Sequence, residues 1–503
     1  MSRSNRKNGG KKKLNLNQEK NINIYNYNLI NEAELETFKS TDSFEVMKKA
    51  AKSSFDYIKK NVKFTNILIV CGPGNNGGDG LLIAKLFDEN NFDVTIYSPL
   101  GNGKTEDSEK ALNSIKKNNL FKEKVILHEY DLVIDCLFGV GFNRPFSNNL
   151  FFFINELNES KLNIISIDMP SGVYTDTGAI NSIAIKANIT LTFHRLKPGL
   201  ILLPGKEFSG NIEILDIGLI NLDNKTNILI LSPPKLKEPK ITDHKYKRGT
   251  IFIIAGKEMV GASKLATIAA SQSSLRSGAG VSKILIQENN IDYFKPHILE
   301  EMIIKYKNIN DLKNQIKNSN VDSLIYGCGI EIEEKNKNLL SFLLNQSFQL
   351  VLDASVFSLM KNDKEYFFNL LSGRNCKTVL TPHKGEFEKL FTVSENKIHD
   401  CINAAKKTNS IILYKGNDTI IASPEENIYI NNISSPYLAT SGSGDVLAGI
   451  IGGLLAQHYN ILEATKLGCF IHSECGNRLG RGLIASDLIA EIPNILSEMT
   501  ASD

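Results

Sequence analysis

Short apolar runs and amphipathic segments alternate along most of this chain, with turn residues between them. Runs such as 66–70, 131–135 and 164–168 have the length of buried strands. Segments near 106–117 and 151–157 instead carry apolar residues at helical spacing. Because this alternation is typical of parallel sheets covered by helices, it predicts an α/β fold.

The same pattern continues through both halves of the chain and predicts two domains. Helical spacing over 32–60 precedes the first strand, and the stretch 226–245, rich in proline and lysine, is predicted to be a linker. We therefore expect a tail at 1–20, one domain at 21–225 and another at 246–503. Strands of the second domain are expected at 250–255, 281–286, 323–326, 378–380 and 411–414, and an apolar helix at 446–455.

Composition and charge exclude several classes of protein. The chain has 503 residues, of which 42% are hydrophobic and 22% charged, with a formal net charge of +3. The basic residues at 1–20 have no aromatic residues between them, so a disordered tail is expected there rather than a nucleic-acid site. No apolar run reaches the roughly 18 to 20 residues that span a bilayer. Seven cysteines without a C-x-x-C spacing fit a reducing compartment, so we expect a cytoplasmic protein with no nucleic-acid or membrane partner.

A glycine-rich segment directly follows the first strand. Residues 71–80 read CGPGNNGGDG, and an apolar helix is expected at 81–87. Strand, glycine-rich turn and helix in this order form phosphate or nucleotide sites in α/β proteins. The spacing differs from the usual dinucleotide fingerprint, and Asn75, Asn76 and Asp79 add side-chain oxygens and amides. The segment predicts a ligand site, with a tight turn alone as the alternative.

Polar side chains follow three strands of the first domain. Asn76 and Asp79 follow one strand, and Asp135 ends another. Asp168 and Ser171 follow a third. Because the carboxyl ends of parallel strands open onto one edge of the sheet, these side chains are expected to converge. Together they offer hard oxygen ligands for a cation and a carboxylate for proton transfer, although each Asp alone could be a turn residue.

The stretch 440–449, TSGSGDVLAG, leads into the apolar helix of the second domain. Glycines let successive backbone N–H groups face one concavity, and a helix N-terminus favours an anion such as phosphate. Asp445 places a carboxylate in that position, which suits a base that deprotonates a hydroxyl during phosphoryl transfer. The alternative is that Asp445 only caps the helix.

These segments also carry a family resemblance. Residues 71–80, 131–145, 166–172 and 192–199 resemble the NAD(P)H-hydrate epimerase family. From Lys247 onward the chain resembles the ADP-dependent NAD(P)H-hydrate dehydratase family, which has a ribokinase-like fold. The tandem resembles the family of bifunctional bacterial repair enzymes. The resemblance therefore implies a Rossmann-like doubly wound first domain and a ribokinase-like α/β/α second domain.

The resemblance also implies roles in the first domain. Asp168 would be the catalytic acid/base, and Asn76, Asp135 and Ser171 would bind K⁺. Whether His194 and Lys197 bind the ligand or are structural stays open. The implied substrate contacts are Asn75, Asn76, Gly77, Gly78, Asp79, Gly139, Val140, Gly141, Phe142, Asn143, Arg144, Pro145 and Asp168.

In the second domain, the resemblance makes Asp445 the catalytic base. The implied hydrate contacts are Ala262, Gly329, His383 and Asp445, and the implied ADP contacts are Lys415, Gly416, Asn417, Asp418, Thr419 and Gly444. Two positions depart from the family pattern: Cys328 stands where proline is usual, and Ser355 stands where the family has a second Asp.

The implied function is repair of hydrated NADH and NADPH. The first domain would interconvert the R and S hydrates, NADHX and NADPHX, with K⁺ bound. The second would dehydrate the S hydrate with ADP, assisted by Mg²⁺, releasing AMP and phosphate. A homo-oligomer is expected. The alternatives are a ribokinase-like small-molecule kinase with a fused nucleotide-binding module, and a binding module without catalytic activity.

Overall fold

The computed structural model describes residues 22–116, 118–142, 146–180, 182–257, 260–375 and 378–501. The chain divides into two compact units, Met1–Thr226 and Asn227–Asp503. Each unit contains one sheet covered by helices, which confirms the predicted α/β class with two domains. The tail at 1–20 and the predicted contacts Asn143, Arg144 and Pro145 lie outside the described residues.

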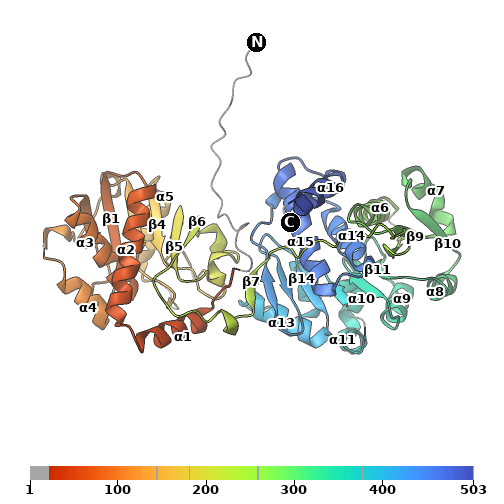
Figure 1. The fold of residues 1–503 in the computed structure, drawn as a ribbon, viewed down its shortest axis with the longest axis horizontal. Coiled ribbons are helices and arrows are strands. Elements are labelled where there is room, and N and C mark those ends of the chain that lie inside the picture. Colours follow the sequence, from red (N-terminus) through yellow and green to blue (C-terminus); the bar gives the residue numbers. More distant parts are fainter. Residues whose placement is uncertain are drawn as a thin grey trace, which may run out of the picture. The chain divides into compact units, whose positions relative to one another are not determined.

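The sheet of the first unit is parallel and has the strand order β2-β1-β3-β4-β5-β6 (Figure 1). Strand β1 pairs with β2 on one side and with β3 on the other, so the strand order reverses direction there. In doubly wound sheets, ligands bind outside the carboxyl ends of the strands at such a reversal. The bounds are β1 Asn66–Cys71, β2 Asp93–Tyr97, β3 Leu132–Cys136, β4 Asn163–Ile167, β5 Ile189–Phe193 and β6 Asn211–Leu215.

Helices cover both faces of this sheet because its central strands are apolar on both sides. Ile67 and Ile69 of β1 pack in one hydrophobic cluster with α2 and α3, whereas Leu68 and Val70 pack in another with α5. Such continuous apolar runs are typical of parallel strands buried on both faces. The helix bounds are α1 Tyr27–Phe38, α2 Ser43–Asn61, α3 Asn75–Glu89, α4 Glu106–Asn113 and α5 Asn148–Glu159.

Two predicted helices of this unit need correction. The periodic stretch 32–60 is divided into α1 and α2, because Asp42 caps the second helix by accepting hydrogen bonds from two backbone N–H groups of its first turn. Helix α3 begins at Asn75 and therefore includes most of the glycine-rich segment. Its glycines permit close packing, since a Cβ on Gly80 would lie 2.7 Å from Cys136 Cβ.

The sheet of the second unit is mixed, with the order β10-β9-β8-β11-β12-β13-β14-β15-β16-β7. Its strands are parallel from β10 to β14, and β15 is antiparallel to both of its neighbours. The bounds are β7 Ile228–Ile230, β8 Thr250–Ile254, β9 Val281–Gln287, β10 Met302–Tyr306, β11 Ser323–Tyr326, β12 Gln349–Leu352, β13 Thr378–Leu380, β14 Ile411–Tyr414, β15 Ile420–Ala422 and β16 Ile428–Ile430.

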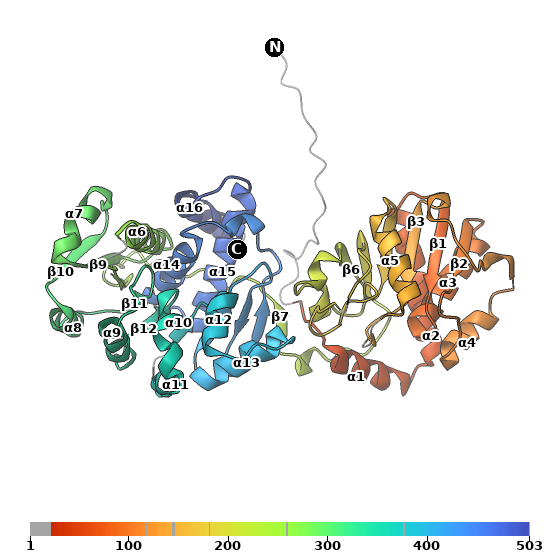
Figure 2. The same ribbon diagram turned by 180° about the vertical axis from the view of Figure 1, so that it is seen from behind.

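Four long helices, α6, α14, α15 and α16, share one hydrophobic core with the middle of this sheet. Helices α9 to α13 lie along the opposite side of the unit (Figure 2). The helix bounds are α6 Val260–Arg276, α7 Ile291–Phe294, α8 Ile309–Lys317, α9 Glu334–Leu344, α10 Ser355–Met360, α11 Lys364–Ser372, α12 Lys384–Leu390, α13 Lys397–Thr408, α14 Ser443–Ala456, α15 Ile461–Leu479 and α16 Ala485–Ala501.

Strand β7 lies within the stretch 226–245 that the sequence predicts to be a linker. It pairs in parallel with β16, so residues 228–230 form an edge strand of the second sheet. The apolar triplet of β7 allows this pairing, and the proline-rich residues come after it.

Helix α14 packs closely on α6 because glycines face it. A Cβ on Gly449 would lie 1.9 Å from Ser273 Oγ and 2.3 Å from Ala270 O, and the backbone oxygen cannot move without displacing α6. We expect Gly449→Ala to destabilise the second unit by about 1–3 kcal/mol, as overpacking does, despite the roughly 1 kcal/mol that alanine gains in a helix. Thermal unfolding of the full chain measures this.

Gly261→Ala provides the matched control for that measurement. A Cβ on Gly261 would meet nothing within 4 Å, although this glycine also lies in a helix. Its melting temperature is expected to stay unchanged or to rise. If both variants melt at the same temperature, close packing between α14 and α6 does not limit stability.

Candidate functional site

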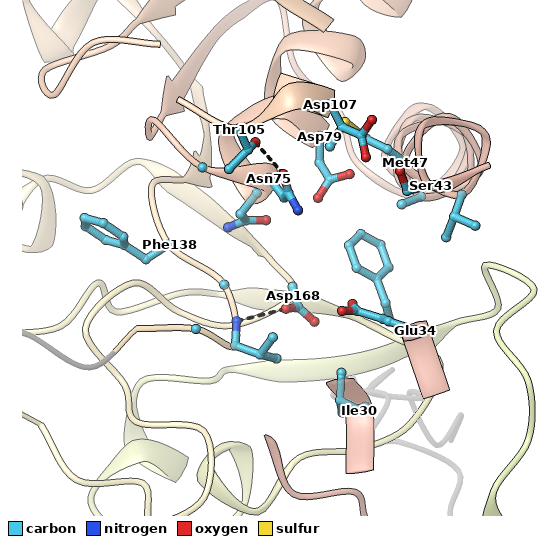
Figure 3. Close-up of a pocket in the computed structure, with 18 of the residues that line it drawn as sticks. Ile30, Glu34, Ser43, Met47, Asn75, Asp79, Thr105, Asp107, Phe138 and Asp168 are labelled. Atoms are coloured by element: carbon cyan, nitrogen blue, oxygen red, sulfur yellow. Dashed lines mark hydrogen bonds between the residues drawn. The ribbon is translucent and has the colours of Figure 1, made fainter. Parts of the chain in front are cut away.

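The first unit contains a cavity of about 550 Å³ at the carboxyl ends of β1 and β3 (Figure 3). Side chains of α1 and α2 line it together with the turns that follow β1, β3 and β4. This volume is in the range of small-molecule sites. The predicted substrate contacts that line it are Asn75, Asn76, Asp79, Gly139, Val140, Gly141, Phe142 and Asp168.

Asp168 lies directly after β4 and is almost fully buried. Its φ of +66° turns the chain sharply at the end of the strand. Oδ1 accepts a hydrogen bond from Lys197 Nζ at 2.8 Å, and Oδ2 accepts one from the Val140 backbone N–H at 3.2 Å. Lys197 Nζ also donates to Thr192 Oγ1 and to Phe193 O, so all three of its protons are used. Lys197 is therefore the buried counterion of Asp168, which lines the cavity.

Two further carboxyl groups line the cavity beside Asp168. Glu34, on α1, has its pKa raised to about 7 by burial and by the negative charge of Asp168, although the charge of Lys197 lowers it. Burial, Asp168 and Glu34 raise the pKa of Asp79 well above its usual value. Sequence reasoning missed Glu34 because it stands on an amphipathic helix outside every motif. No local signal distinguishes it from Glu32 or Glu36.

The predicted cation ligands lie at the carboxyl edge of the sheet. Asp135 is fully buried and accepts four hydrogen bonds, at 2.6–3.2 Å, from Ser171 Oγ and N, Ser166 Oγ and the Leu137 N–H. Burial raises its pKa, and these hydrogen bonds partly oppose that rise. Asn76 donates through Nδ2 to Ile167 O at 3.2 Å, while its Oδ1 is buried and has no hydrogen-bond partner among the described residues.

Two predicted contacts, Gly77 and Gly78, lie outside the cavity lining, and the structure also places His194 and Lys197, whose roles were left open. A Cβ on Gly77 would overlap Gly72 O at 1.8 Å, so this glycine serves the turn. His194 is buried against Tyr25 rather than lining the cavity, and burial lowers its pKa to about 4. Lys197, whose role was left open, contacts Asp168 directly.

In the second unit, four neighbouring parallel strands place polar groups at one edge of the sheet. Cys328 follows β11, Asp353 follows β12, His383 follows β13 and Lys415 follows β14. The Cys328 thiol and the carboxylates of Asp353 and Asp445 all lie within 4.8 Å of one another. Strand order therefore explains how residues distant in sequence meet.

Asp445 belongs to the first turn of α14, whose N-cap is Gly442 with a φ of +83°. The residue is thus inside the helix rather than at the capping position. Burial and the charge of Asp353 raise its pKa to about 6, while a hydrogen bond from Cys328 and the charge of Lys415 lower it. Asp445 is therefore a carboxylate that changes protonation near neutral pH at the N-terminus of a helix, as a general base does.

Lys415 is the cation of this cluster. Its Nζ donates to Asp353 Oδ1 at 2.6 Å and lies 3.8 Å from Glu386 Oε2. Burial alone lowers the Lys415 pKa, but the two carboxylates outweigh burial and raise it. A Cβ on Gly444 would lie 3.4 Å from Lys415 Nζ, so the lysine reaches the first turn of α14. The amine thus stays protonated beside Asp445.

In the predicted ADP loop, which follows β14, some side chains bond to other residues of the protein. Asp418 is buried and pairs with Lys397 at 2.6 Å, and the Thr419 hydroxyl bonds to the backbone of Gly416. These two residues hold the loop in shape. Lys415 reaches Gly444, whereas Gly416 lies close to the amine of Lys397.

The other three predicted hydrate contacts of the second unit, besides Asp445, lie on α6, after β11 and at the start of α12. Ala262 is exposed on α6, and Gly329 approaches the neighbouring Ser263 so closely that a Cβ would lie 2.6 Å from its Cα. His383 is the N-cap of α12: its Nδ1 accepts from Glu386 N at 3.3 Å, and Glu386 accepts from His383 N at 2.9 Å. Its side chain remains 58% exposed, so the ring can still contact a ligand.

His472 of α15 is a second residue that sequence reasoning missed. Its Nε2 lies 2.9 Å from Ser443 Oγ, at the start of α14, and burial lowers its pKa to about 4. The neutral imidazole of His472 therefore holds Ser443, and with it the start of α14, through this hydrogen bond. Its position within an apolar helix gave no signal for this role.

Comparisons with known proteins match each half of the chain to a described family. Residues 43–199 match a family described as YjeF-related protein N-terminus, and residues 251–496 match one described as NAD(P)H-hydrate dehydratase. A solved structure of an ADP/ATP-dependent NAD(P)H-hydrate dehydratase from Bacillus subtilis is 24% identical and covers 53% of this chain and 95% of its own, with a TM-score of 0.45.

Two α/β units with separate clusters of buried carboxylates define a two-domain enzyme. A bifunctional NAD(P)H-hydrate repair enzyme from Dictyoglomus turgidum is 30% identical over 93% of this chain and 96% of its own, and one from Escherichia coli is 26% identical over 90% of both. The chain belongs to the family of bifunctional NAD(P)H-hydrate repair enzymes. This confirms the predicted family and favours it over the kinase alternative.

Proposed function

We propose that this protein repairs hydrated NADH and NADPH in two steps. The unit Met1–Thr226 interconverts the R and S hydrates, and the unit Asn227–Asp503 dehydrates the S hydrate with ADP. The observation that carries the proposal is Asp445, which lies beside Cys328, Asp353 and Lys415 at the N-terminus of α14. Family membership supports the same assignment.

The dehydratase chemistry follows from the groups around Asp445. The hydrate hydroxyl is a poor leaving group, so it must first be activated. Asp445 removes the hydroxyl proton while the oxygen attacks the β-phosphorus of ADP, which releases AMP. Lys415 and the N–H groups of the α14 turn stabilise the transferred phosphoryl group. The bond between ring carbon and phosphate oxygen then breaks, and loss of a ring proton restores the dihydropyridine. Mg²⁺ on ADP is part of the proposal.

We assign K⁺ to the first unit. Asn76 Oδ1 is a buried oxygen without a partner, and Asp135 is a buried carboxylate bonded only to neutral donors among the described residues. Asn76, Asp135 and Ser171 together give hard oxygen donors and one negative charge, which fit a hard cation. When bound, K⁺ would orient the substrate oxygens beside Asp168.

Removing K⁺ is expected to slow epimerisation and to lower the melting temperature of the first unit. A ligand at ten times its dissociation constant stabilises by about 1.4 kcal/mol, so a rise of a few degrees is expected when KCl replaces tetramethylammonium chloride. Asn76→Ala should abolish this response. An equal rise in wild type and Asn76→Ala would contradict the assignment.

We also propose that the protein acts in the cytoplasm as a homo-oligomer that uses only small-molecule substrates. The cysteines Cys71, Cys136, Cys328, Cys401, Cys469 and Cys475 are all free, which supports a reducing compartment. Among the described residues, no helix has the length and apolarity needed to cross a membrane. Light scattering of the purified chain tests the oligomeric state.

The function is tested by recovery of NADH absorbance from a mixture of both hydrate epimers. With ADP and Mg²⁺, complete recovery is expected, because the first unit supplies the S hydrate that the second consumes. Omission of ADP should prevent recovery. A stable phosphorylated product with no NADH formed would favour a kinase instead.

Cys328 gives a test of the base assignment through pH. Its hydrogen bond lowers the pKa of Asp445, so Cys328→Ala should raise that pKa above about 6. Because the base must be deprotonated, the acid limb of kcat/KM for dehydration should move to higher pH, with little change above pH 8. Cys401→Ala, at a buried cysteine of α13, is the control. An unmoved acid limb would contradict the role of Asp445.

A further inference from the structure

The cavity of the first unit holds two carboxyl groups whose surroundings favour opposite protonation states. Figure 3 shows the carboxyl groups of Glu34 and Asp168 turned toward each other. Asp168 is paired with Lys197 at 2.8 Å, which stabilises its negative charge. Glu34 has no ion-pair partner among the described residues of its surroundings, and burial with the Asp168 charge raises its pKa to about 7.

Such a pair has the properties of an acid and a base that work together. When neighbouring groups push two carboxyl groups toward different protonation states, the protonated one can donate a proton while the ionised one accepts a proton. The two groups come from separate elements, Glu34 from α1 and Asp168 from the turn after β4, so a ligand between them can meet them on different faces.

Epimerisation of the hydrate requires both operations. Water adds to the reduced nicotinamide ring at the carbon next to the ring nitrogen, because the nitrogen lone pair stabilises a cation there. To invert that carbon, its C–O bond must break as the nitrogen lone pair forms a C=N⁺ bond, and the leaving oxygen needs a proton. Water must then add to the other face and lose a proton.

We propose that Glu34 is the second catalytic residue of the epimerase, donating the proton that lets the hydroxyl leave as water while Asp168 accepts the proton from the water that adds to the opposite face. This rests on the proposed function. The reaction leaves Glu34 ionised and Asp168 protonated, with no net change in atoms. Because the two groups face each other, transfer of that proton back through water restores the starting state. The opposite epimer uses the reverse roles.

Other charged groups define the pH range of this pair. Asp79 of α3 lines the same cavity, and burial together with the charges of Asp168 and Glu34 raises its pKa well above the usual value. Lys104 and Asp107 also line the cavity. Lys197 lowers the pKa of Glu34, and Asp168 raises it. Since Glu34 must be protonated to donate, the epimerase should lose activity as pH rises through about 7.

The test compares Glu34→Gln with Glu36→Gln in the full chain. Glu36 lies on the same helix but is paired with Lys39 at the surface. Separated R and S hydrates are equilibrated without ADP and followed by chromatography, with the uncatalysed rate subtracted. Glu34→Gln is expected to lower kcat/KM by about 100-fold or more and to remove the basic limb near pH 7, while Glu36→Gln changes neither. The dehydratase rate with S hydrate should be unchanged in both.

The outcomes separate the inference from the proposed function. If the wild type does not equilibrate the epimers, the proposed function fails. If the wild type is active and Glu34→Gln keeps its rate within threefold, or is slower but keeps the basic limb, Glu34 is not the acid. If Glu34→Gln unfolds the first unit, Glu34→Asp decides: a displaced basic limb supports the inference, and an unmoved limb overturns it.

Discussion

Asp445→Asn is expected to lower the rate of ADP-dependent dehydration by about a thousandfold, within the range that general bases contribute. The variant keeps the size of the side chain and removes its ability to accept a proton. It also removes one of the negative charges beside Lys415, so ADP should bind at least as tightly as in the wild type. Isothermal titration with ADP and a dehydration assay on the S hydrate measure the two effects.

The epimerase activity of the same protein serves as an internal control for Asp445→Asn, since the two sites belong to separate units. A loss of dehydration accompanied by weaker ADP binding would indicate that Asp445 positions the nucleotide. A rate within a few fold of the wild type would show that Asp445 is not the base and has only a structural role in the first turn of α14.

Apolar runs that end in polar residues were the part of the chain easiest to interpret. The strands predicted around 66–70, 131–135 and 411–414 form as expected. Within each unit, the residues that follow such strands lie at one edge of its sheet, because neighbouring parallel strands end there. Asp168 could therefore be proposed as a site residue from its place after a strand, and Asp445 from the glycine-rich stretch before α14, without knowledge of side-chain geometry. Their exact partners could not, because Lys197 and Cys328 reach them only through the turns of the backbone.

Residues contributed by helices were the part that the sequence left hidden. Glu34 lies on α1 and His472 on α15, and the apolar spacing of each sequence indicates only an ordinary helix. Nothing in that spacing separates these two residues from ordinary surface or core residues. The start of α3 was placed too late for a related reason: glycines usually signal turns, whereas here they permit a helix to pack against β1 and β3. Tertiary contacts decided each of these cases.

Asp168→Asn is expected to abolish epimerisation and to destabilise the first unit. The backbone tolerates the change, because asparagine also adopts the positive φ of this turn. The buried Lys197 would lose its negatively charged partner and keep only neutral acceptors, among them Thr192 Oγ1 and Phe193 O. Breaking a buried ion pair by removing one partner costs about 3–5 kcal/mol, so a large fall in melting temperature of this unit is expected.

The double variant Asp168→Asn with Lys197→Met separates catalysis from stability. Replacing both partners of a buried pair by neutral residues avoids the uncompensated charge, so the melting temperature should return toward that of the wild type. Epimerisation should remain absent, because no carboxylate is left opposite Glu34 to accept the proton from the incoming water. If the double variant recovered epimerase activity along with stability, Asp168 would be a structural counterion of Lys197, and another group of the cavity would have to accept the proton.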